Sequence, residues 1–459
     1  NLAIMYFNGH GVSQDKKLAV NWYTKAAEQG HSDAQNNLGW IYQYGQGVPQ
    51  DNKLAVSWYI KAAKQENDKA QGNLGWMYQN GYGVTKNLKK AFEFYEKSAN
   101  QGYAEAQKNL GWMYANGHGV TQDNKLAVSW YKKAANQGNS VAQNNLGWMY
   151  FNGHGITQDY KLALSWFTKA ADQSYAEAEY GLGVMYFYGH GITQNYALAL
   201  SWYKKSAEQG NSIAQYSLGV MYFNGYGTFQ DYKLAVDWYK KSADQGYAEA
   251  QYNLGWMYAN GKGVSQDYEL AVSWFKKGIE AGNNESAFSL GLEYSDQESQ
   301  YYDIQLAIKY LEIAYELGDR DAPTLLGTFY NWGPDGGDLG LEQDIQKAEY
   351  WYLKSAKEYD DASSQSFLAN IYGQPSVWPE MHDAQKSFYW AKKSADQGNL
   401  LGMDYLAKHY ELGRGTKQSG EMAIKTYKDI IKKGDLNYSM NALRYIGGIY
   451  AQGWTEIGR

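Results

Sequence analysis

The sequence predicts an all-α protein, a right-handed α-solenoid superhelix of about twelve 36-residue helix-turn-helix repeats. The first observation is a Leu-Gly pair that returns every 36 residues. The second is that each interval contains two stretches with helical periodicity, whereas no segment alternates with a period of two. A fixed period of about 20 to 50 residues is typical of a solenoid, in which each repeat buries its apolar face by stacking on its neighbours. The pairs stand at Leu38-Gly39, Leu74-Gly75, Leu110-Gly111, Leu146-Gly147, Leu182-Gly183, Leu218-Gly219, Leu254-Gly255, Leu290-Gly291 and Leu326-Gly327.

The first helix of a repeat is predicted from the stretch that begins at Asp33 and reads DAQNNLGWIYQYG. Ala34, Leu38 and Ile41 fall on one helical stripe, which would face the core. Two glycines, at 45 and 47, follow where a helix end and a left-handed turn favour glycine.

The second helix is predicted from Asn52 onward, because Asp51 stands just before a periodic apolar run and is typical of an N-cap. Ala55, Trp58 and Tyr59 lie on its inward stripe. The equivalent acids of other repeats are interpreted as helix caps too, and they are Asp15, Asp123, Asp159, Asp231 and Asp267.

The repeat pattern is Ala-x-x-x-Leu-Gly-x-Met-Tyr-x-x-Gly-x-Gly-Val, followed by Asp-x-x-x-Ala-x-x-Trp-Tyr-x-Lys-Ala-Ala-x-Gln-Gly. It resembles the Sel-one-like repeat family, an α-solenoid relative of tetratricopeptide repeats, over essentially the whole chain. The resemblance implies scaffolding or partner binding, and many bacterial members act at the cell envelope or on host proteins. We therefore expect an exported or periplasmic bacterial protein. One branch of the family carries a disulfide in each repeat, and a chain without cysteine does not belong to it.

Two parts of the chain differ in regularity, and we predict a regular array over 1–327 and irregular repeats with longer inter-helix loops over 328–459. The next equivalents of the Leu-Gly pair are Leu368-Ala369, Leu406-Ala407 and Ile446-Gly447, at wider spacings. The extra residues fall in 331–344 and 373–380. These insertions are either tolerated surface loops or partner-binding loops with Trp332 and Trp378 as exposed anchors. The chain begins at Asn1 inside a first helix, so we expect it to be a fragment.

Composition excludes several classes of partner. The net charge is −6 over 459 residues and no basic stripe exists, which argues against nucleic acid and anionic membrane surfaces. No run of apolar residues is long enough to span a bilayer. The sequence thus predicts no nucleic-acid binding and no membrane insertion.

The spacing of the candidate catalytic and metal-binding residues does not bring them together into a site. The Gly-x-Gly turns follow a helix, whereas a dinucleotide-binding loop follows a strand. His118, His154 and His190 occupy one turn position in consecutive repeats, and stacked helices about 8–10 Å apart place them too far apart to share a metal ion. No nucleophile, base and orienting group converge. We expect no enzyme, no cofactor and no metal site.

The remaining candidates are two columns of residues on the first helix, three positions apart and therefore on one side of it. In related solenoids the first helices line the concave groove, and an asparagine column there resembles the ladders that hold a peptide backbone. Nearby glutamines such as Gln35 and Gln71 could extend this surface. The candidate partner-binding residues are Asn37, Asn73, Asn109, Asn145 and Asn253, with Trp40, Trp76, Trp112, Trp148 and Trp256.

These columns predict a non-catalytic adaptor that holds a protein or an extended peptide in the concave groove. A glycan-binding protein of the cell envelope is the alternative, because indoles stack on sugar rings and amides bond hydroxyls. Packing between adjacent helices is an equally good interpretation of the tryptophans, since Val184, Val220 and Leu292 replace them elsewhere. For the asparagines, the alternative to partner binding is that they form hydrogen bonds within the stack.

Overall fold

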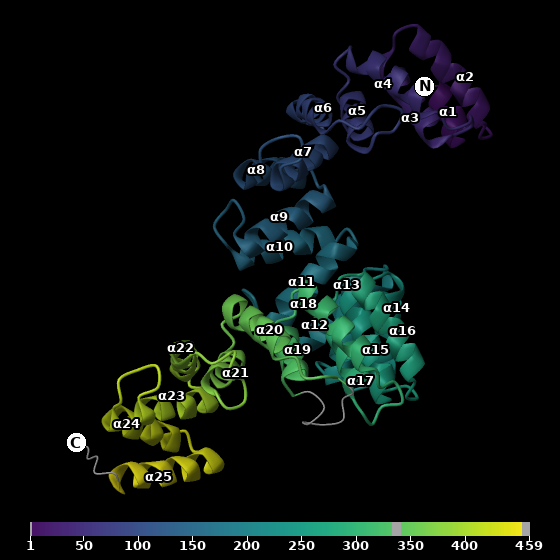
Figure 1. Cartoon of the computed structure of the whole chain (residues 1–459). Helices are drawn as coiled ribbons and strands as arrows, with labels where there is room; N and C mark the ends of the chain where they lie inside the picture. The colour runs from purple at the N-terminus through teal and green to yellow at the C-terminus, as the bar shows by residue number, and fades with distance from the viewer. Residues whose placement is uncertain (1, 333–340, 452–459) are drawn as a thin grey trace. The chain divides into compact units, whose positions relative to one another are not determined.

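The computed structural model describes residues 2–332 and 341–451, and within those ranges it contains helices and no strands. The predicted all-α class and the stack of about twelve helix pairs are confirmed (Figure 1). Two compact units are present, Asn1–Ser242 and Ala243–Arg459. The boundary at 327/328 that the sequence predicts is one of loop length and stays a prediction.

Odd-numbered helices are the first helices of the repeats. They are α1 (Leu2–Asn8), α3 (Ser32–Tyr44), α5 (Asp68–Asn80), α7 (Ala104–Asn116), α9 (Ser140–Asn152), α11 (Ala176–Tyr188), α13 (Ser212–Asn224), α15 (Ala248–Asn260), α17 (Asn284–Ser295), α19 (Ala322–Trp332), α21 (Ala362–Gly373), α23 (Leu400–Leu412) and α25 (Leu436–Ala451).

Even-numbered helices are the second helices. They are α2 (Lys16–Glu28), α4 (Asn52–Ala63), α6 (Leu88–Asn100), α8 (Asn124–Asn136), α10 (Tyr160–Ala171), α12 (Tyr196–Glu208), α14 (Tyr232–Asp244), α16 (Tyr268–Glu280), α18 (Ile304–Glu316), α20 (Ile345–Glu358), α22 (Ala384–Asp396) and α24 (Gly420–Lys432).

The Leu-Gly pair is explained by the contact between the two helices of a repeat. Leu38 is fully buried, and a Cβ at Gly39 would lie 2.7 Å from the Cδ1 atom of Tyr59 in α4. The aromatic ring of the second helix therefore rests on the bare backbone of the first. The same contact recurs at Gly75 with Tyr95, Gly111 with Tyr131, Gly147 with Phe167, Gly183 with Tyr203, Gly219 with Tyr239, Gly255 with Phe275 and Gly327 with Tyr352.

The ends of the helices follow the predicted signals. The Asp51 carboxylate accepts a hydrogen bond from the Leu54 amide at 2.9 Å, as an N-cap does. Gly45 has a φ of +65° and ends α3 in the left-handed region. The other predicted caps are confirmed by hydrogen bonds to the amide three residues on, at Asp15, Asp123, Asp159, Asp231 and Asp267.

Consecutive repeats are joined by a column of buried glutamines on the first helices. Gln107 Nε2 donates to the Ala99 carbonyl at the end of α6, and Gln107 Oε1 accepts from Gln137 just after α8 at 2.8 Å. The orphan carbonyls of a helix C-terminus are satisfied in this way. The same glutamine-to-glutamine bond links Gln65 to Gln35, Gln101 to Gln71, and Gln173 to Gln143.

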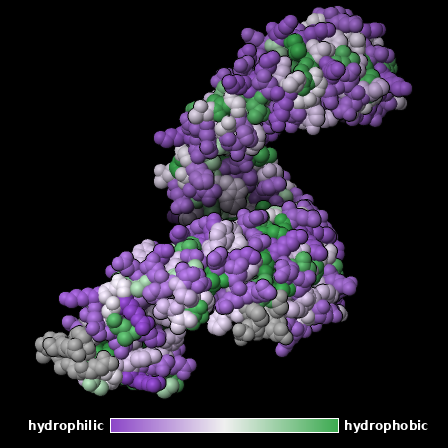
Figure 2. All heavy atoms as spheres, viewed as in Figure 1, coloured by the Kyte–Doolittle hydropathy of each residue, from purple (hydrophilic) through white to green (hydrophobic). Residues whose placement is uncertain are grey.

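The second helices carry the Trp column of the repeat motif, and from α2 to α16 each of its indoles lies beneath a lysine one turn later. Lys133 Nζ lies 3.7 Å from the Trp130 ring centroid, a distance typical of a cation–π contact. Hydrophilic residues cover most of the face seen in Figure 2, and the hydrophobic patches between them are small. Of the two predicted loop anchors, Trp332 is exposed, whereas Trp378 is half-buried against the core.

Candidate partner-binding groove

A cavity of about 330 Å³ opens across three consecutive first helices, α3, α5 and α7, within the unit that ends at Ser242. Three residues that the sequence predicts as partner-binding line it: Asn73 and Trp76 from α5, and Asn109 from α7. Its other lining residues are Gln43, Tyr44, Gly72, Gln79, Asn80, Tyr103, Glu105, Ala106 and Lys108.

The predicted asparagines are half-buried, and the structure gives them partners inside the stack. Asn73 Nδ2 donates to Oδ1 of the buried Asn36 in the preceding first helix, at 2.9 Å. Asn109 hydrogen-bonds to the phenol of Tyr95, and Asn145 hydrogen-bonds to that of Tyr131. Asn37 makes the equivalent bond to Tyr23. A side-chain amide has two donors and a carbonyl oxygen, so one bond fixes its orientation and leaves further hydrogen-bonding capacity.

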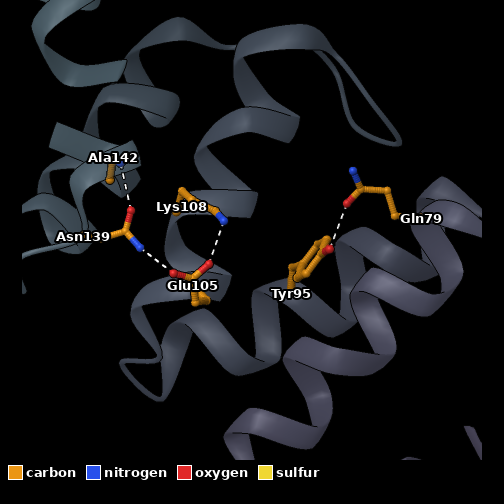
Figure 3. A network of polar contacts seen from close by, with 6 residues as sticks. All are labelled: Gln79, Tyr95, Glu105, Lys108, Asn139 and Ala142. Carbon is orange, nitrogen blue, oxygen red and sulfur yellow. Dashed lines mark hydrogen bonds and ion pairs between the residues drawn. The ribbon is translucent and has the colours of Figure 1, made fainter. Parts of the chain in front are cut away.

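Hydrogen bonds link α7 to α5 through the buried Tyr95 of α6. The Tyr95 hydroxyl accepts from Asn109 and donates to Gln79 Oε1 at 2.8 Å (Figure 3). Burial raises the pKa of Tyr95, the charge of Glu105 raises it further, and the bond from Asn109 lowers it. The phenol is therefore neutral and acts as donor and acceptor at once.

The predicted tryptophans combine packing with exposure. Trp40 is 40 % exposed and contacts Tyr44 with ring centroids 5.1 Å apart. Trp76 is half-buried and contacts Tyr82 at 5.0 Å. Trp112 contacts His118 at 4.6 Å, and Trp148 meets the buried Phe167 at 5.0 Å. Each indole thus has one side supported by the stack, and the exposed remainder lies on the first-helix surface.

A charged group stands at the α7 end of the groove. Glu105 accepts hydrogen bonds from Lys108 Nζ and Asn139 Nδ2, both at 2.6 Å (Figure 3). Asn139 in turn caps α9 by accepting from the Ala142 amide. The Lys108 side chain is 21 % exposed and that of Glu105 is 49 % exposed, so water screens the pair in part.

The remaining predicted residues, Asn253 and Trp256, lie on α15 in the unit that starts at Ala243. Both are half-buried, and Trp256 packs against the core of that unit. In α11, which precedes α15 in the sequence, the Asn and Trp positions are occupied by Gly181 and Val184, and both residues are buried. The cavity therefore brings together three of the ten predicted residues.

Sequence reasoning misplaced the glutamines and missed much of the groove lining. Gln35 and Gln71 are buried at 5 % exposure and bond within the stack, so the expectation that they extend the binding surface is wrong. The missed lining residues include Gln79, Tyr103 and Lys108. Gly72 gives the signal that could have found them, because this position carries a side chain in the neighbouring first helices.

Two further observations concern metal binding and membranes, and both apply to the described ranges. There, no group of three or more His, Asp or Glu side chains is placed to hold a metal ion. His190 stacks on Tyr160 with ring centroids 4.9 Å apart, so this turn histidine packs against the first residue of α10. Within the same ranges, every helix is too short or too polar to cross a membrane.

Comparison with known proteins identifies the repeat. The family model described as Sel1 repeat matches twelve segments, 1–31, 32–67, 68–103, 104–139, 140–175, 176–211, 212–247, 248–283, 284–319, 325–360, 362–399 and 401–427. A protective antigen of uropathogenic Escherichia coli strains, which displays an SLR fold, is 29 % identical with a TM-score of 0.61, over 94 % of each chain. A Sel1 repeat protein of Oxalobacter formigenes is 37 % identical with a TM-score of 0.50, over 60 % of this chain and 79 % of that one. The resemblance seen in the sequence is confirmed, and the chain belongs to the Sel1 repeat family.

Proposed function

We propose that this protein is a non-catalytic adaptor that holds an extended segment of a partner protein along the first helices α3, α5 and α7. The Sel1 solenoid is typical of protein-interaction scaffolds. The observation that supports the finer proposal is the groove of about 330 Å³, which contains Asn73, Trp76 and Asn109. An extended chain exposes a peptide group at every residue, and fixed amides can bond it repeatedly without reading its sequence.

Preorganisation strengthens the proposal. Asn73 is held by Asn36, and Asn109 is held by Tyr95, so neither side chain must be ordered when a peptide binds. Ordering a side chain at an interface costs about 0.5–1.5 kcal/mol, and this cost has already been met in the free protein. The half-buried Trp76 would then supply the apolar contact that makes a hot spot.

The test is a selection of unstructured peptides on the wild-type protein, followed by affinity measurement on variants. Asn73→Ala with Asn109→Ala, and separately Lys108→Gln, are expected to weaken the selected peptide by about tenfold or more, equivalent to about 1.4 kcal/mol. Asn100→Ala with Asn136→Ala is the matched control, because both asparagines are exposed on second helices. Equal affinity for all variants, with unchanged circular dichroism, would contradict the proposal.

Glycan binding is a second candidate, favoured by the mixture of aromatic rings and polar groups around the cavity. Tyr44, Trp76 and Tyr103 could stack on sugar rings, and Gln79 and Asn80 could bond hydroxyls. Saturable quenching of tryptophan fluorescence by oligosaccharides, lost in Trp76→Ala and accompanied by no peptide enrichment, would replace the peptide proposal with this one.

A further inference from the structure

Two polar residues interrupt apolar columns of the repeat in its irregular part. Ser387 of α22 is buried at a position where the other second helices carry alanine. His409 of α23 is buried where most first helices carry Ile or Met. The alanines are Ala19, Ala55, Ala91, Ala127, Ala163, Ala199, Ala235, Ala271, Ala307, Ala348 and Ala423. The Ile and Met residues include Ile41, Met77, Met113, Met149, Met185, Met221, Met257 and Ile371.

The two exceptions contact each other. His409 Nε2 lies 2.8 Å from Ser387 Oγ, and His409 Nδ1 lies 2.7 Å from the Arg414 carbonyl oxygen. Ser387 Oγ also lies 2.6 Å from the Ala369 carbonyl oxygen. A buried serine and a buried histidine in place of Ala and Met would each cost stability alone, and their mutual bond offsets that cost.

The arrangement has a proton requirement. Carbonyl oxygens only accept, so Nδ1 must carry a hydrogen and the Ser387 hydroxyl donates to Ala369. His409 Nε2 then faces the oxygen of the Ser387 hydroxyl, whose only hydrogen is already donated to Ala369. All three bonds are satisfied together when Nε2 is protonated as well, which makes His409 an imidazolium. The hydrogen bonds therefore favour a positive charge at a buried site.

A cavity of about 170 Å³ lies beside this pair, in the unit that starts at Ala243. Gly373 opens it, because a Cβ there would lie 2.8 Å from Ser387 Oγ. The volume is small, well below the roughly 300 Å³ of a typical ligand pocket, and suits one functional group. The lining residues are Ala369, Asn370, Gly373, Gln374, Ser387, Tyr405, Lys408, His409, Leu412 and Arg414.

The lining is cationic. Lys408 and Arg414 contribute positive charges, and the lining contains no carboxylate. Lys408 is paired with Asp404 Oδ2 at 2.7 Å, whereas the exposed Arg414 guanidinium has no ion-pair partner in the described part of the chain. Gln374 donates a hydrogen bond to Asn370 Oδ1. The carbonyl oxygen of Asn370 is therefore used, and its NH2 group can donate to a ligand.

We propose that this cavity binds a single oxyanion group, a phosphate or a carboxylate, between Arg414, Lys408 and the Asn370 amide. The guanidinium binds such a group through two parallel N–H bonds. His409 is a positioning residue: its nitrogens are occupied by Ser387 and Arg414, and its ring, charged once it is protonated, lies in the cavity lining. This inference does not depend on the peptide groove of α3, α5 and α7.

Binding should depend on pH through His409. Burial lowers the pKa of His409 below its usual value, the bond to the Arg414 carbonyl raises it, and the Arg414 charge lowers it. On α23 itself, Lys408 lines the cavity and is paired with Asp404. Glu411 of α23 accepts a hydrogen bond from Tyr427 of α24, and the α21 and α22 residues in the lining are neutral. A bound anion favours the imidazolium, so affinity should rise as the pH falls through the pKa of His409.

The experiment titrates the whole chain, labelled at its 7 histidines, with inorganic phosphate and separately with N-acetylglycine as a carboxylate probe. The His409 imidazole resonance, assigned by its loss in His409→Met, should move saturably at millimolar concentration. The probe that saturates at lower concentration identifies the group. Arg414→Gln should weaken binding by about tenfold, equivalent to about 1.4 kcal/mol, whereas the exposed Lys417→Gln on the same turn should not.

Three results would overturn the proposal. They are an unchanged His409 resonance with both probes, equal affinity of Arg414→Gln and wild type, and equal weakening by Lys417→Gln, which would indicate diffuse charge attraction. His409→Met restores the residue of other repeats and is expected to fold. Binding of N-acetylglycine, whose carboxylate stays ionised well above its pKa of about 3.5, should lose its pH dependence in this variant when followed by calorimetry. Retention of the same pH dependence would remove His409 from the site.

Discussion

Gly111 of α7 lies under the ring of Tyr131, and a Cβ there would be 2.7 Å from the ring carbon Cδ1. Gly447 of α25 occupies the equivalent position of the final helix, where nothing lies within 4 Å. Gly111→Ala should therefore lower the melting temperature, because an overpacked core costs about 1–3 kcal/mol. Gly447→Ala should leave it unchanged or raise it, since alanine favours a helix over glycine by about 1 kcal/mol. Thermal unfolding followed by circular dichroism compares the two, and equal shifts would contradict the packing argument.

Each second helix begins with a side-chain cap, and Asp123 of α8 shows what it contributes. Its carboxylate accepts from the Lys125 and Leu126 amides at 2.9 and 3.0 Å. Asp123→Ala should destabilise the helix by about 0.5–2 kcal/mol, because these amides lose their partner. Asp123→Asn keeps an acceptor and should retain most of the stability. Urea denaturation of both variants checks this, and an asparagine variant as unstable as the alanine one would show that charge matters more than the cap bond.

Across the whole molecule, tyrosines of the second helices are buried in repeat after repeat. Burial raises the pKa of Tyr131, despite the bond from Asn145, from 10.0 to about 12, and it raises the pKa of Tyr59, Tyr95 and Tyr203 as well. These phenols ionise more readily in the unfolded chain than in the folded one. Their contribution to stability is complete below pH 10, the ordinary pKa, and is lost as the pH rises toward and through the folded pKa.

Alkaline titration should therefore show unfolding coupled to tyrosinate formation above pH 10. Ultraviolet difference spectra report the tyrosinate and circular dichroism reports the helices. Tyr131→Phe removes one such phenol and should move the alkaline midpoint upward, whereas the exposed Tyr188→Phe should not. Ionisation of most tyrosines before any loss of helix would contradict the coupling.

Much of the fold could be predicted from the sequence because its signals are local. The Asp caps, the turn glycines and the helical stripes each depend on residues within one turn or one helix. The packing role of the glycine in each Leu-Gly pair could not be predicted, because the contact of Gly39 with Tyr59 depends on the distance between two helices.

The candidate site could be predicted only in part. Three of the predicted residues, Asn73, Trp76 and Asn109, share one cavity, and their role in binding stays a prediction. The bond from Asn109 to Tyr95 depends on rotamers in two different helices, which no spacing reveals. Gln107 is polar and yet buried, because it satisfies a carbonyl at the end of α6. The pair of Ser387 and His409 was readable as two interruptions of apolar columns, although only the structure brings them into contact.

The glutamine hydrogen bonds between repeats bear on how the array can change its number of repeats by recombination. Each joins side chains of the same kind at the same separation, as Gln137 does with Gln107 and Gln173 does with Gln143. Recombination that deleted 104–139 would place Gln143 against the end of α6, where Gln107 now donates. The new junction would re-form its hydrogen bonds from like residues, so a single genetic event can remove or add a whole repeat and change the length of the array.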